Sequence, residues 1–330
     1  MNFPRLSRDN NKKFKVLFVR FSSLGDVVLT SHIAKMLKEL YPSFELTWLT
    51  ETTYEPLLKE LPWIDRIICW DRRKTGNLGF FKLIAKIRRE HFDILFNMHC
   101  NDRMVLFTLL SGIAEKIGAH KHFQFVYDQD VYEVVGQLGI PLCLEKQISR
   151  SLIRPSGISP LDPFSVKKTD NYCVALAIGA SHIRKRWPVV RWEKLIDALL
   201  ARGCLIVLLG TGKDEEDMAM TLKEYAPVEQ VINLTGKLSL EDLIRVIDDS
   251  SLLISGDTGP LHIGRALGIK TIALFGPTSL SLAYMKSFTK VLYTPCKFMG
   301  CLDWKCTKPC MEEISAESVI SAVDEILGIL

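Results

Sequence analysis

The stretch VRFSSLGDVVLTSHIAKML, residues 19–37, begins as an apolar strand, turns through Ser-Ser-Leu-Gly and continues with the periodicity of a helix. One acidic residue, Asp26, lies where the turn becomes the helix. An acid here is explained either as a helix N-cap or as a functional group that the helix dipole keeps ionised. An ionised carboxylate that faces a cleft can take a proton from a hydroxyl group, so Asp26 is a candidate general base.

Strands and helices alternate on both sides of this stretch. In the first half we expect strands at 15–21, 44–50, 65–70, 92–98 and 116–119, with helices at 27–41, 52–60, 77–90 and 101–110. In the second half we expect strands at 172–180, 204–210, 230–236, 251–259 and 270–276, with helices at 191–203, 213–226, 239–250, 260–268 and a last helix over 315–330. Such alternation predicts α/β domains with parallel sheets.

A segment rich in proline and polar residues, 154–171, interrupts the alternation and is typical of a linker. We therefore predict two doubly wound, Rossmann-like domains over 1–160 and 161–330, and we allow the last helix to pack back on the first domain. Open parallel sheets bind ligands beyond the carboxyl ends of their strands. Two such domains that face each other would bind ligands in a central cleft.

Composition limits the class of protein. The chain has 330 residues, 48% of them hydrophobic and 24% charged, with a formal net charge of +4. This balance fits anionic small molecules or a membrane surface and is too weak to indicate nucleic acid. The first residues lack the apolar region of a signal peptide, and no apolar run approaches a membrane-spanning length. We predict a cytoplasmic protein.

The stretch SGDTGPLHI, residues 255–263, is the most informative in the second half. Asp257 and Thr258 precede a helix with Pro260 in its first turn, and its free N–H groups form an anion site. Gly256 and Gly259 let the backbone approach a phosphate closely, and His262 lies in the same turn. The alternative is an ordinary N-cap followed by a turn.

Cationic residues follow another strand, in ASHIRKRWP at 180–188. Lys185 is suited to neutralising a pyrophosphate. The alternative is a solvated basic loop, which is the commoner structure of such a group of cationic residues. FGPTS at 275–279 follows a further strand. These two segments add Ser181, Gly276 and Thr278 to the candidate ligand-binding residues.

Several short patterns are set aside. GTGK at 210–213 lacks the P-loop spacing, and the absence of GxGxxG after the first strand argues against a dinucleotide oxidoreductase. DQD at 128–130 resembles a metal-binding motif that also arises by chance, and His120 and His122 lack a third ligand with suitable spacing. We predict no metal site.

Nine cysteines are present. The spacing near the end, C-x4-C-x4-C-x3-C, is poor for zinc and wrong for the common iron–sulfur motifs. We expect a structural loop there, with a disulfide in some conditions. The other cysteines lie in apolar stretches and are expected to be reduced. The cluster comprises Cys296, Cys301, Cys306 and Cys310, and the scattered ones are Cys69, Cys100, Cys143, Cys173 and Cys204.

Taken together, these motifs resemble glycosyltransferase family 9, the heptosyltransferases. VRFSSLGDVVLTSHIAKMLKELYPSFELTWLT resembles the N-terminal motif of that family, SGDTGPLHIGRALGIKTIALFGPTS its donor-binding motif and KRWPVVRWEKL its K-x-W-P segment. The cysteine-rich tail before MEEISAESVISAV is also a common ending there. The resemblance covers both domains in the same order.

The resemblance implies a GT-B fold and inverting, metal-independent transfer of heptose. The donor would be ADP-L-glycero-β-D-manno-heptose and the acceptor the inner core of lipopolysaccharide, at the cytoplasmic face of the inner membrane. Asp26 matches the proposed base and Lys185 a phosphate contact. Asp257, Thr258, Gly259 and His262 match the donor loop. No cofactor is implied beyond the nucleotide-sugar co-substrate.

The N-terminal domain would bind the anionic glycolipid acceptor. Candidates in its loops are Ser23, Gly25, Arg72, Arg73, Arg103, His120 and Lys121. The helix that carries Lys82, Lys86, Arg88 and Arg89 can rest on anionic lipid, or it is an ordinary solvated face. We expect a monomer.

Alternatives remain open: a family member that uses another nucleotide sugar or acceptor, a sugar-nucleotide epimerase of similar architecture, and a non-catalytic nucleotide-binding protein. An epimerase needs further acids and a histidine near the anomeric carbon, which Asp26 alone does not supply. Asp26→Asn separates these hypotheses, because only a transferase loses turnover while it still binds donor.

Overall fold

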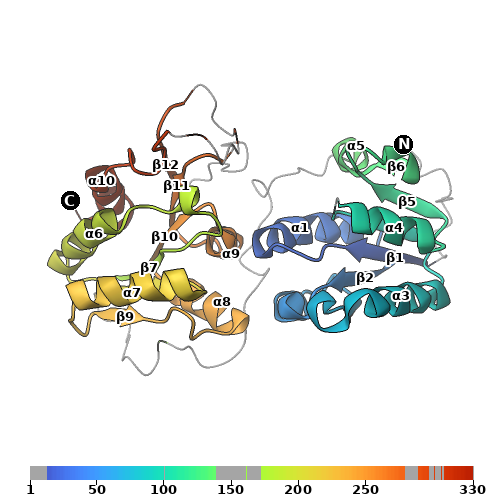
Figure 1. Cartoon of the computed structure of the whole chain (residues 1–330), viewed down its shortest axis with the longest axis horizontal. Helices are drawn as coiled ribbons and strands as arrows, with labels where there is room; N and C mark the ends of the chain where they lie inside the picture. The colour runs from blue at the N-terminus through green and yellow to red at the C-terminus, as the bar shows by residue number, and fades with distance from the viewer. Residues whose placement is uncertain are drawn as a thin grey trace. The chain divides into compact units, whose positions relative to one another are not determined.

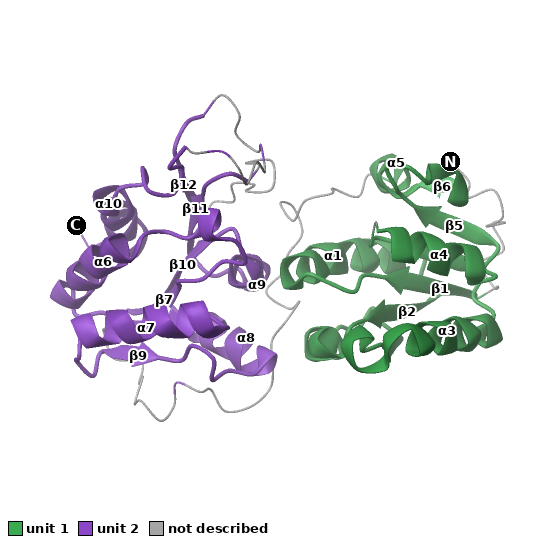
Figure 2. Ribbon diagram, viewed as in Figure 1, with its two compact units in different colours: residues 1–147 green, residues 148–330 purple. Residues whose placement is uncertain are grey.

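A computed structural model describes residues 13–99, 101–138, 161, 172–278, 289–296, 301, 306 and 308–329 (Figure 1). The chain divides into two compact units, unit 1 over residues 1–147 and unit 2 over residues 148–330 (Figure 2). Apart from residue 161, the predicted boundary at 160/161 and the predicted linker lie outside the described residues, as do Cys100 and Cys143. These remain predictions.

Unit 1 is built on six parallel strands in the order β3-β2-β1-β4-β5-β6. The strands are β1 (Phe14–Val19), β2 (Phe44–Thr50), β3 (Arg66–Cys69), β4 (Ile94–Asn97), β5 (Glu115–Gly118) and β6 (Gln129–Asp130). The helices are α1 (Leu24–Leu40), η1 (Thr52–Tyr54), α2 (Glu55–Leu58), α3 (Arg72–Glu90), α4 (Asp102–Leu110), η2 (Gln124–Val126) and α5 (Val131–Gln137).

Helices α3 and α4 cover one face of this sheet. Their apolar residues, among them Phe80, Ile87 and Phe107, pack with Leu17 and Val19 of β1 in one core cluster. Burial on both faces explains why the central strand is an almost unbroken apolar run. The sheet therefore fixes its carboxyl-end loops on a rigid support.

Unit 2 repeats the arrangement, with strand order β12-β11-β10-β7-β8-β9. The strands are β7 (Cys173–Ala177), β8 (Leu205–Leu209), β9 (Val231–Asn233), β10 (Leu252–Gly256), β11 (Thr271–Phe275) and β12 (Thr289–Tyr293). The helices are η4 (Ile183–Lys185), α6 (Val189–Ala201), α7 (Lys213–Tyr225), α8 (Leu240–Asp249), α9 (Gly259–Leu267) and α10 (Ala316–Leu327).

The last helix, α10, belongs to the core of unit 2. Its Val319 and Val323 are fully buried in that core, which also includes residues of α6. Asp324 on α10 accepts hydrogen bonds from Nε and Nη2 of Arg202 at 2.5 and 2.6 Å. Tyr172 donates a further bond to the carbonyl of Leu327 at 2.7 Å. The C-terminal helix is thus held against the start of β7 and the end of α6.

Both sheets have the doubly wound order, so each has a switch point where successive strands run outward in opposite directions. The switch point lies between β1 and β4 in unit 1 and between β7 and β10 in unit 2. The predicted fold class, two parallel α/β sheets flanked by helices, is confirmed. Ligand sites are expected at these two strand pairs.

Some elements differ from the expectations. α3 begins before the predicted residue 77, with non-helical backbone at Gly76, and β6, α5 and β12 were not predicted. These strands lie at sheet edges and are partly exposed, so their apolar pattern is weak. Within the described ranges, no helix is long and apolar enough to span a membrane.

Candidate active site

Asp26 lies at the switch point of unit 1, on the first turn of the helix that follows β1. Ser23 is the N-cap of α1 and Asp26 the third helical residue, so the interpretation of Asp26 itself as the N-cap is wrong. The backbone N–H and the hydroxyl of Ser23 lie 3.1 and 3.0 Å from Oδ2 of Asp26. Arg20, which follows β1, forms an ion pair with the same oxygen.

The three contacts that the Asp26 side chain makes with described residues all use Oδ2. Among residues 13–99 and 101–138, none donates a hydrogen bond to Oδ1. The side chain keeps 43% of its area exposed. One oxygen is therefore held in place while the other is open to a substrate proton, which is the arrangement a general base requires.

His99 completes this cluster and was not singled out from the sequence. It follows β4, whose Asn97 pairs with Val19 of β1, so strand order brings it beside Arg20. Arg20 also donates to the carbonyl of Met98. Burial, and then the charge of Arg20, lower the pKa of His99 from 6.5 to about 4, and its buried Nδ1 has no hydrogen-bond partner among the described residues. The imidazole is therefore neutral at pH 7 and lies within the electrostatic influence of Asp26.

The acceptor candidates divide into two groups. Ser23 contacts Asp26, and the charge of Arg72 reaches His99. Gly25 is buried in α1. Arg73, in α3, is exposed. The other three lie further along the same sheet edge: Arg103 in α4 donates to Oδ1 of Asn77 at 3.0 Å, His120 lies 3.1 Å from Asp102, and Lys121 is exposed.

In unit 2 the switch point brings together Lys185, Asp257 and His262. Nζ of Lys185 lies 3.0 Å from Oδ2 of Asp257, and Nε2 of His262 lies 3.5 Å from Oδ1. Lys185 comes from the loop after β7, and Asp257 from the turn after β10. The interpretation of SHIRKRWP as a solvated basic loop is wrong, because only 17% of the Lys185 side chain is exposed.

The carboxyl of Asp257 is ionised by its surroundings. Burial alone raises its pKa, but the hydrogen bond from His262 and the charge of Lys185 outweigh burial and hold the pKa well below its ordinary value. In the part of the chain that the structure describes, the buried Nδ1 of His262 has no hydrogen-bond partner. Asp257 thus positions a cation and an imidazole at this strand end.

The N-terminus of α9 lies beside this trio. Thr258 is the N-cap but its side chain makes no capping bond; its hydroxyl lies 3.0 Å from the hydroxyl of Ser255. A Cβ at Gly256 would lie 3.3 Å from the carbonyl oxygen of Lys185, so glycine allows that loop to approach. Gly259 opens the helix. First-turn N–H groups and a lysine at one place can bind a phosphate.

The remaining donor candidates have different surroundings. Ser181 is exposed. A Cβ at Gly276 would lie 2.8 Å from Sδ of Met311, so this glycine serves packing. Thr278 is buried, and among the described residues its hydroxyl has no partner.

Glu215 also lies at this strand end and was missed from the sequence. A Cβ at Gly179 would lie 2.2 Å from its carboxyl carbon, and Thr211 donates its N–H to Oε2 at 2.7 Å. Burial raises the pKa of Glu215, and the hydrogen bond from Thr211 opposes that rise. The first-turn acids of α7 were the available signal.

The patterns set aside above have structural explanations. In DQD, Asp128 accepts a bond from the N–H of Lys116 at 2.8 Å, and Asp130 caps α5. Seven described cysteines, including Cys296, Cys301, Cys306 and Cys310, are free thiols. In the part of the chain that the structure describes, no three His, Cys, Asp or Glu residues are grouped to hold a metal.

Two doubly wound units, with a carboxylate at one switch point and a lysine beside a helix N-terminus at the other, match the GT-B fold of nucleotide-sugar enzymes. Comparisons with known proteins agree. Residues 152–307 match the profile of glycosyltransferase family 9 (heptosyltransferase). The chain is a glycosyltransferase that is related to the heptosyltransferases of family 9.

Individual relatives are distant but cover most of the chain. Lipooligosaccharide heptosyltransferase 2 of Haemophilus influenzae is 24% identical over 300 residues, which span 80% of this chain and 84% of that protein. The crystal structure of a family 9 glycosyl transferase from Veillonella parvula superimposes with a TM-score of 0.81 at 22% identity, over 97% and 98% of the two chains. The structure of E. coli heptosyltransferase WaaC with ADP superimposes with a TM-score of 0.73 at 19% sequence identity. The match covers 95% of this chain and 100% of that chain.

Proposed function

We propose that this protein is an inverting, metal-independent heptosyltransferase of lipopolysaccharide biosynthesis. It takes heptose from ADP-L-glycero-β-D-manno-heptose and transfers it to the inner core, on Kdo or an earlier heptose. The observation that carries this proposal is the carboxylate of Asp26, which is held through Oδ2 and open at Oδ1. The names of the relatives support the sugar and the acceptor.

Unit 1 binds the acceptor and supplies the base. The acceptor hydroxyl oxygen attacks the anomeric carbon from the face opposite the diphosphate. As the new C–O bond forms, Oδ1 of Asp26 takes the hydroxyl proton. Arg20 and Ser23 keep the carboxylate in the required orientation, and preorganised orientation of this kind contributes strongly to rate.

Unit 2 binds the donor and stabilises the leaving ADP. The bond between the anomeric carbon and the diphosphate oxygen breaks, and negative charge develops on ADP. Lys185 and the first-turn N–H groups of α9 are fixed cationic and dipolar groups suited to that charge. Because these groups can supply the positive charge, we propose that no metal ion is required.

We further propose that the enzyme is a monomer that acts at the cytoplasmic face of the inner membrane, where its glycolipid acceptor is anchored. Neither nucleic acid nor a further cofactor has a role in this reaction. The transfer itself can be tested without a membrane.

The test measures ADP release from ADP-heptose in EDTA, with and without a Kdo-bearing lipid A acceptor. Release that requires acceptor and falls by roughly a thousandfold or more in Asp26→Asn supports the proposal. The matched control is Asp242→Asn. Asp242 is likewise the third residue of its helix, and Ser239 at the N-cap donates to it at 2.7 Å.

Each other outcome has a meaning. If both variants retain activity, Asp26 is only a helix-capping residue and the assignment of the base fails. If ADP-heptose binds without release, the acceptor is different, and other acceptors are screened. If ADP-heptose does not bind, another nucleotide sugar is the donor. Equilibration of donor epimers without acceptor would instead identify an epimerase.

A further inference from the structure

The outer face of α3, α4 and η2 exposes large apolar side chains. On α3, Leu78 and Phe81 keep 68% and 54% of their areas exposed, and Phe125 on η2 keeps 80%. Isolated exposed apolar residues are normal, but a cluster indicates an interaction surface. We call this cluster the α3–α4 surface; it comprises Leu78, Phe81, Leu106, Leu109, Phe123 and Phe125.

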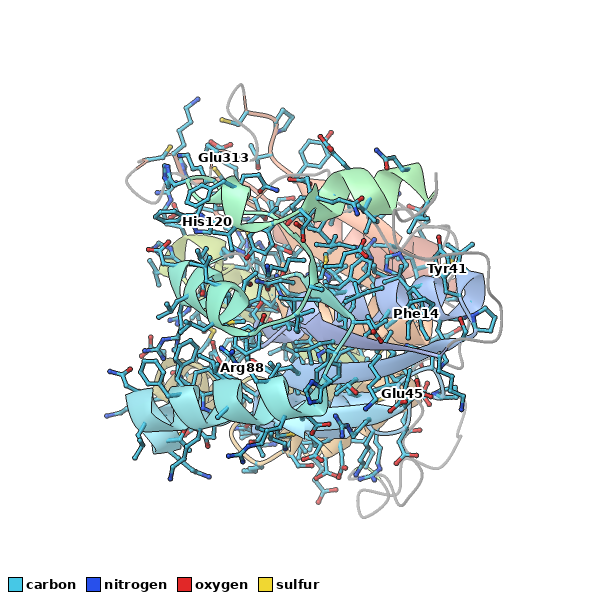
Figure 3. All side chains as sticks on the ribbon, turned by 90° about the vertical axis from the view of Figure 1, so that its right-hand side faces the viewer. Phe14, Tyr41, Glu45, Arg88, His120 and Glu313 are labelled. Atoms are coloured by element: carbon cyan, nitrogen blue, oxygen red, sulfur yellow. The ribbon has the colours of Figure 1, made fainter. Side chains whose placement is uncertain are left out.

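These side chains belong to one continuous surface. Near the starts of the two helices Arg103 donates to Asn77 at 3.0 Å, and near their ends Arg88 donates to the carbonyl of Leu110 at 3.3 Å. Figure 3 labels Arg88 on α3 and shows the row of side chains that stands out from that helix. α3 and α4 therefore lie side by side.

The segment with η2 continues this surface. Val126 and Tyr127 form a buried cluster with Val105 of α4. The ring centroids of Phe123 and Phe125 lie 6.1 Å apart. The exposed aromatic residues of η2 are thus carried beside α4.

Positive charge lies along α3, beside the apolar residues of that helix. The segment 71–90 contains two acidic residues, and both have partners: Asp71 caps α3, and Glu90 pairs with Arg66 at 2.7 Å. Lys82 and Arg89 are exposed, and neither forms an ion pair among the described residues. The cations of the segment are Arg72, Arg73, Lys74, Lys82, Lys86, Arg88 and Arg89.

We propose that the α3–α4 surface docks this enzyme on an anionic lipid bilayer. Aromatic and aliphatic side chains enter the interfacial region of a bilayer while lysine and arginine reach its anionic headgroups. The inference rests on the proposed function, because a glycolipid acceptor lies in such a bilayer. α3 also starts at the carboxyl end of β3, the sheet edge that carries Asp26.

The positive charge of the α3–α4 surface favours a bilayer, rather than a second copy of the chain, as its binding partner. A symmetric dimer through this surface would place the cations of α3 opposite those of its partner. Like charges at such an interface repel, whereas anionic headgroups neutralise them. Charge complementarity therefore favours lipid.

The test measures co-sedimentation of the full chain with vesicles of phosphatidylcholine and phosphatidylglycerol, and with vesicles of phosphatidylcholine alone. The charge variant is Lys82→Gln/Arg89→Gln, and the apolar variant is Phe81→Ser. Each cation near an anionic surface contributes about 1 kcal/mol, so the charge variant should bind about 30-fold more weakly. Phe81→Ser should also weaken binding.

The matched control is Lys194→Gln/Lys290→Gln. It removes the same charge from unit 2, where both lysines form exposed ion pairs, at 3.7 Å to Glu317 and 2.7 Å to Glu325. The proposal holds if only the α3 variants lose binding to phosphatidylglycerol vesicles. It is overturned if the control variant loses as much vesicle binding as the α3 variants, or if the wild-type protein binds neither kind of vesicle. It is also overturned if sedimentation without vesicles shows that the protein forms a dimer through this surface.

This result is independent of the transferase assay. Vesicle binding uses no substrate, so it can fail while ADP release from a short, acyl-free acceptor succeeds. The α3 variants should retain that activity, because none of their substituted residues contacts Asp26 or Lys185. Loss of ADP release in wild type would count against the proposed function alone.

Discussion

Nζ of Lys185 lies 3.0 Å from Oδ2 of Asp257, although the two residues come from different strand ends. Their side chains are 17% and 9% exposed, so this pair is largely withdrawn from water. An ammonium group has three N–H donors. Lys185 can therefore stay bound to Asp257 and still present a donor to a diphosphate, and Asp257 fixes where that donor points.

Lys185→Met should weaken ADP binding by roughly 10- to 100-fold, because a hydrogen bond to a charged group contributes about 1.5–3 kcal/mol. Isothermal titration calorimetry with ADP measures the effect. Lys194→Met is the control, since Lys194 is an exposed cation of the same unit that pairs with Glu317. If wild type and Lys185→Met have equal dissociation constants for ADP, Lys185 does not contribute to donor binding.

His99 should make stability depend on pH. Its pKa is lowered from 6.5 to about 4 in the folded chain, so between these values the unfolded chain binds a proton that the folded chain does not. Stability is therefore full above pH 6.5 and falls as the pH drops toward 4. With allowance for partial exposure, the loss is about 2 kcal/mol.

Urea unfolding of wild type and His99→Gln at about pH 7.5 and pH 4.5 checks this, because most carboxylates stay ionised across that range. The glutamine variant should lose less stability on acidification than wild type by about 2 kcal/mol. His122→Gln, at an exposed histidine, should behave as wild type. The same pH dependence in wild type and His99→Gln would mean that His99 is not the responsible group.

The sequence predicted the fold better than the contacts of the site. Apolar strands and turn residues are local signals, so the parallel sheets and the positions of Asp26, Lys185 and Asp257 at strand ends could be read directly. His99 and Arg20 could not be placed, because they meet only when β1 pairs with β4. That pairing depends on strand order, which no local pattern encodes.

Some residues lie at the predicted strand ends but make contacts that the sequence did not predict. Asp257 was expected to meet the donor, yet its carboxylate is occupied by Lys185 and His262. Gly276 was a candidate for donor binding, and Met311 fills the space beside it. Both outcomes depend on side chains far along the chain, so motif matching could not foresee them.

Gly276→Ala tests the packing role of this glycine. The added Cβ would lie 2.8 Å from Sδ of Met311, which is itself only 4% exposed. Unfolding free energy should fall by about 1–3 kcal/mol, as for other overpacked cores. Combining it with Met311→Ala should cost less than the sum of the two single changes in urea unfolding. Additive stability losses with weakened ADP binding would instead indicate a donor contact.

Arg20 should control the rate of transfer without affecting the donor. Its guanidinium pairs with Oδ2 of Asp26 and donates to the carbonyl of Met98, so it fixes the carboxylate against β4. In Arg20→Gln the carboxylate keeps only its contacts with Ser23 and can rotate. We expect kcat to fall by roughly 10- to 100-fold, because small misplacements of a reacting group have effects of that size.

Steady-state kinetics with both substrates checks this, and the Kd for ADP should stay unchanged because Arg20 belongs to unit 1. Arg20→Lys retains a cation and should recover part of kcat, whereas Ser23→Ala removes only a hydroxyl that lies 3.0 Å from Asp26 and should have a smaller effect. If Arg20→Gln instead raised kcat, the ion pair would hold Asp26 in an inactive state. The base would then need to leave Arg20 before it could accept a proton.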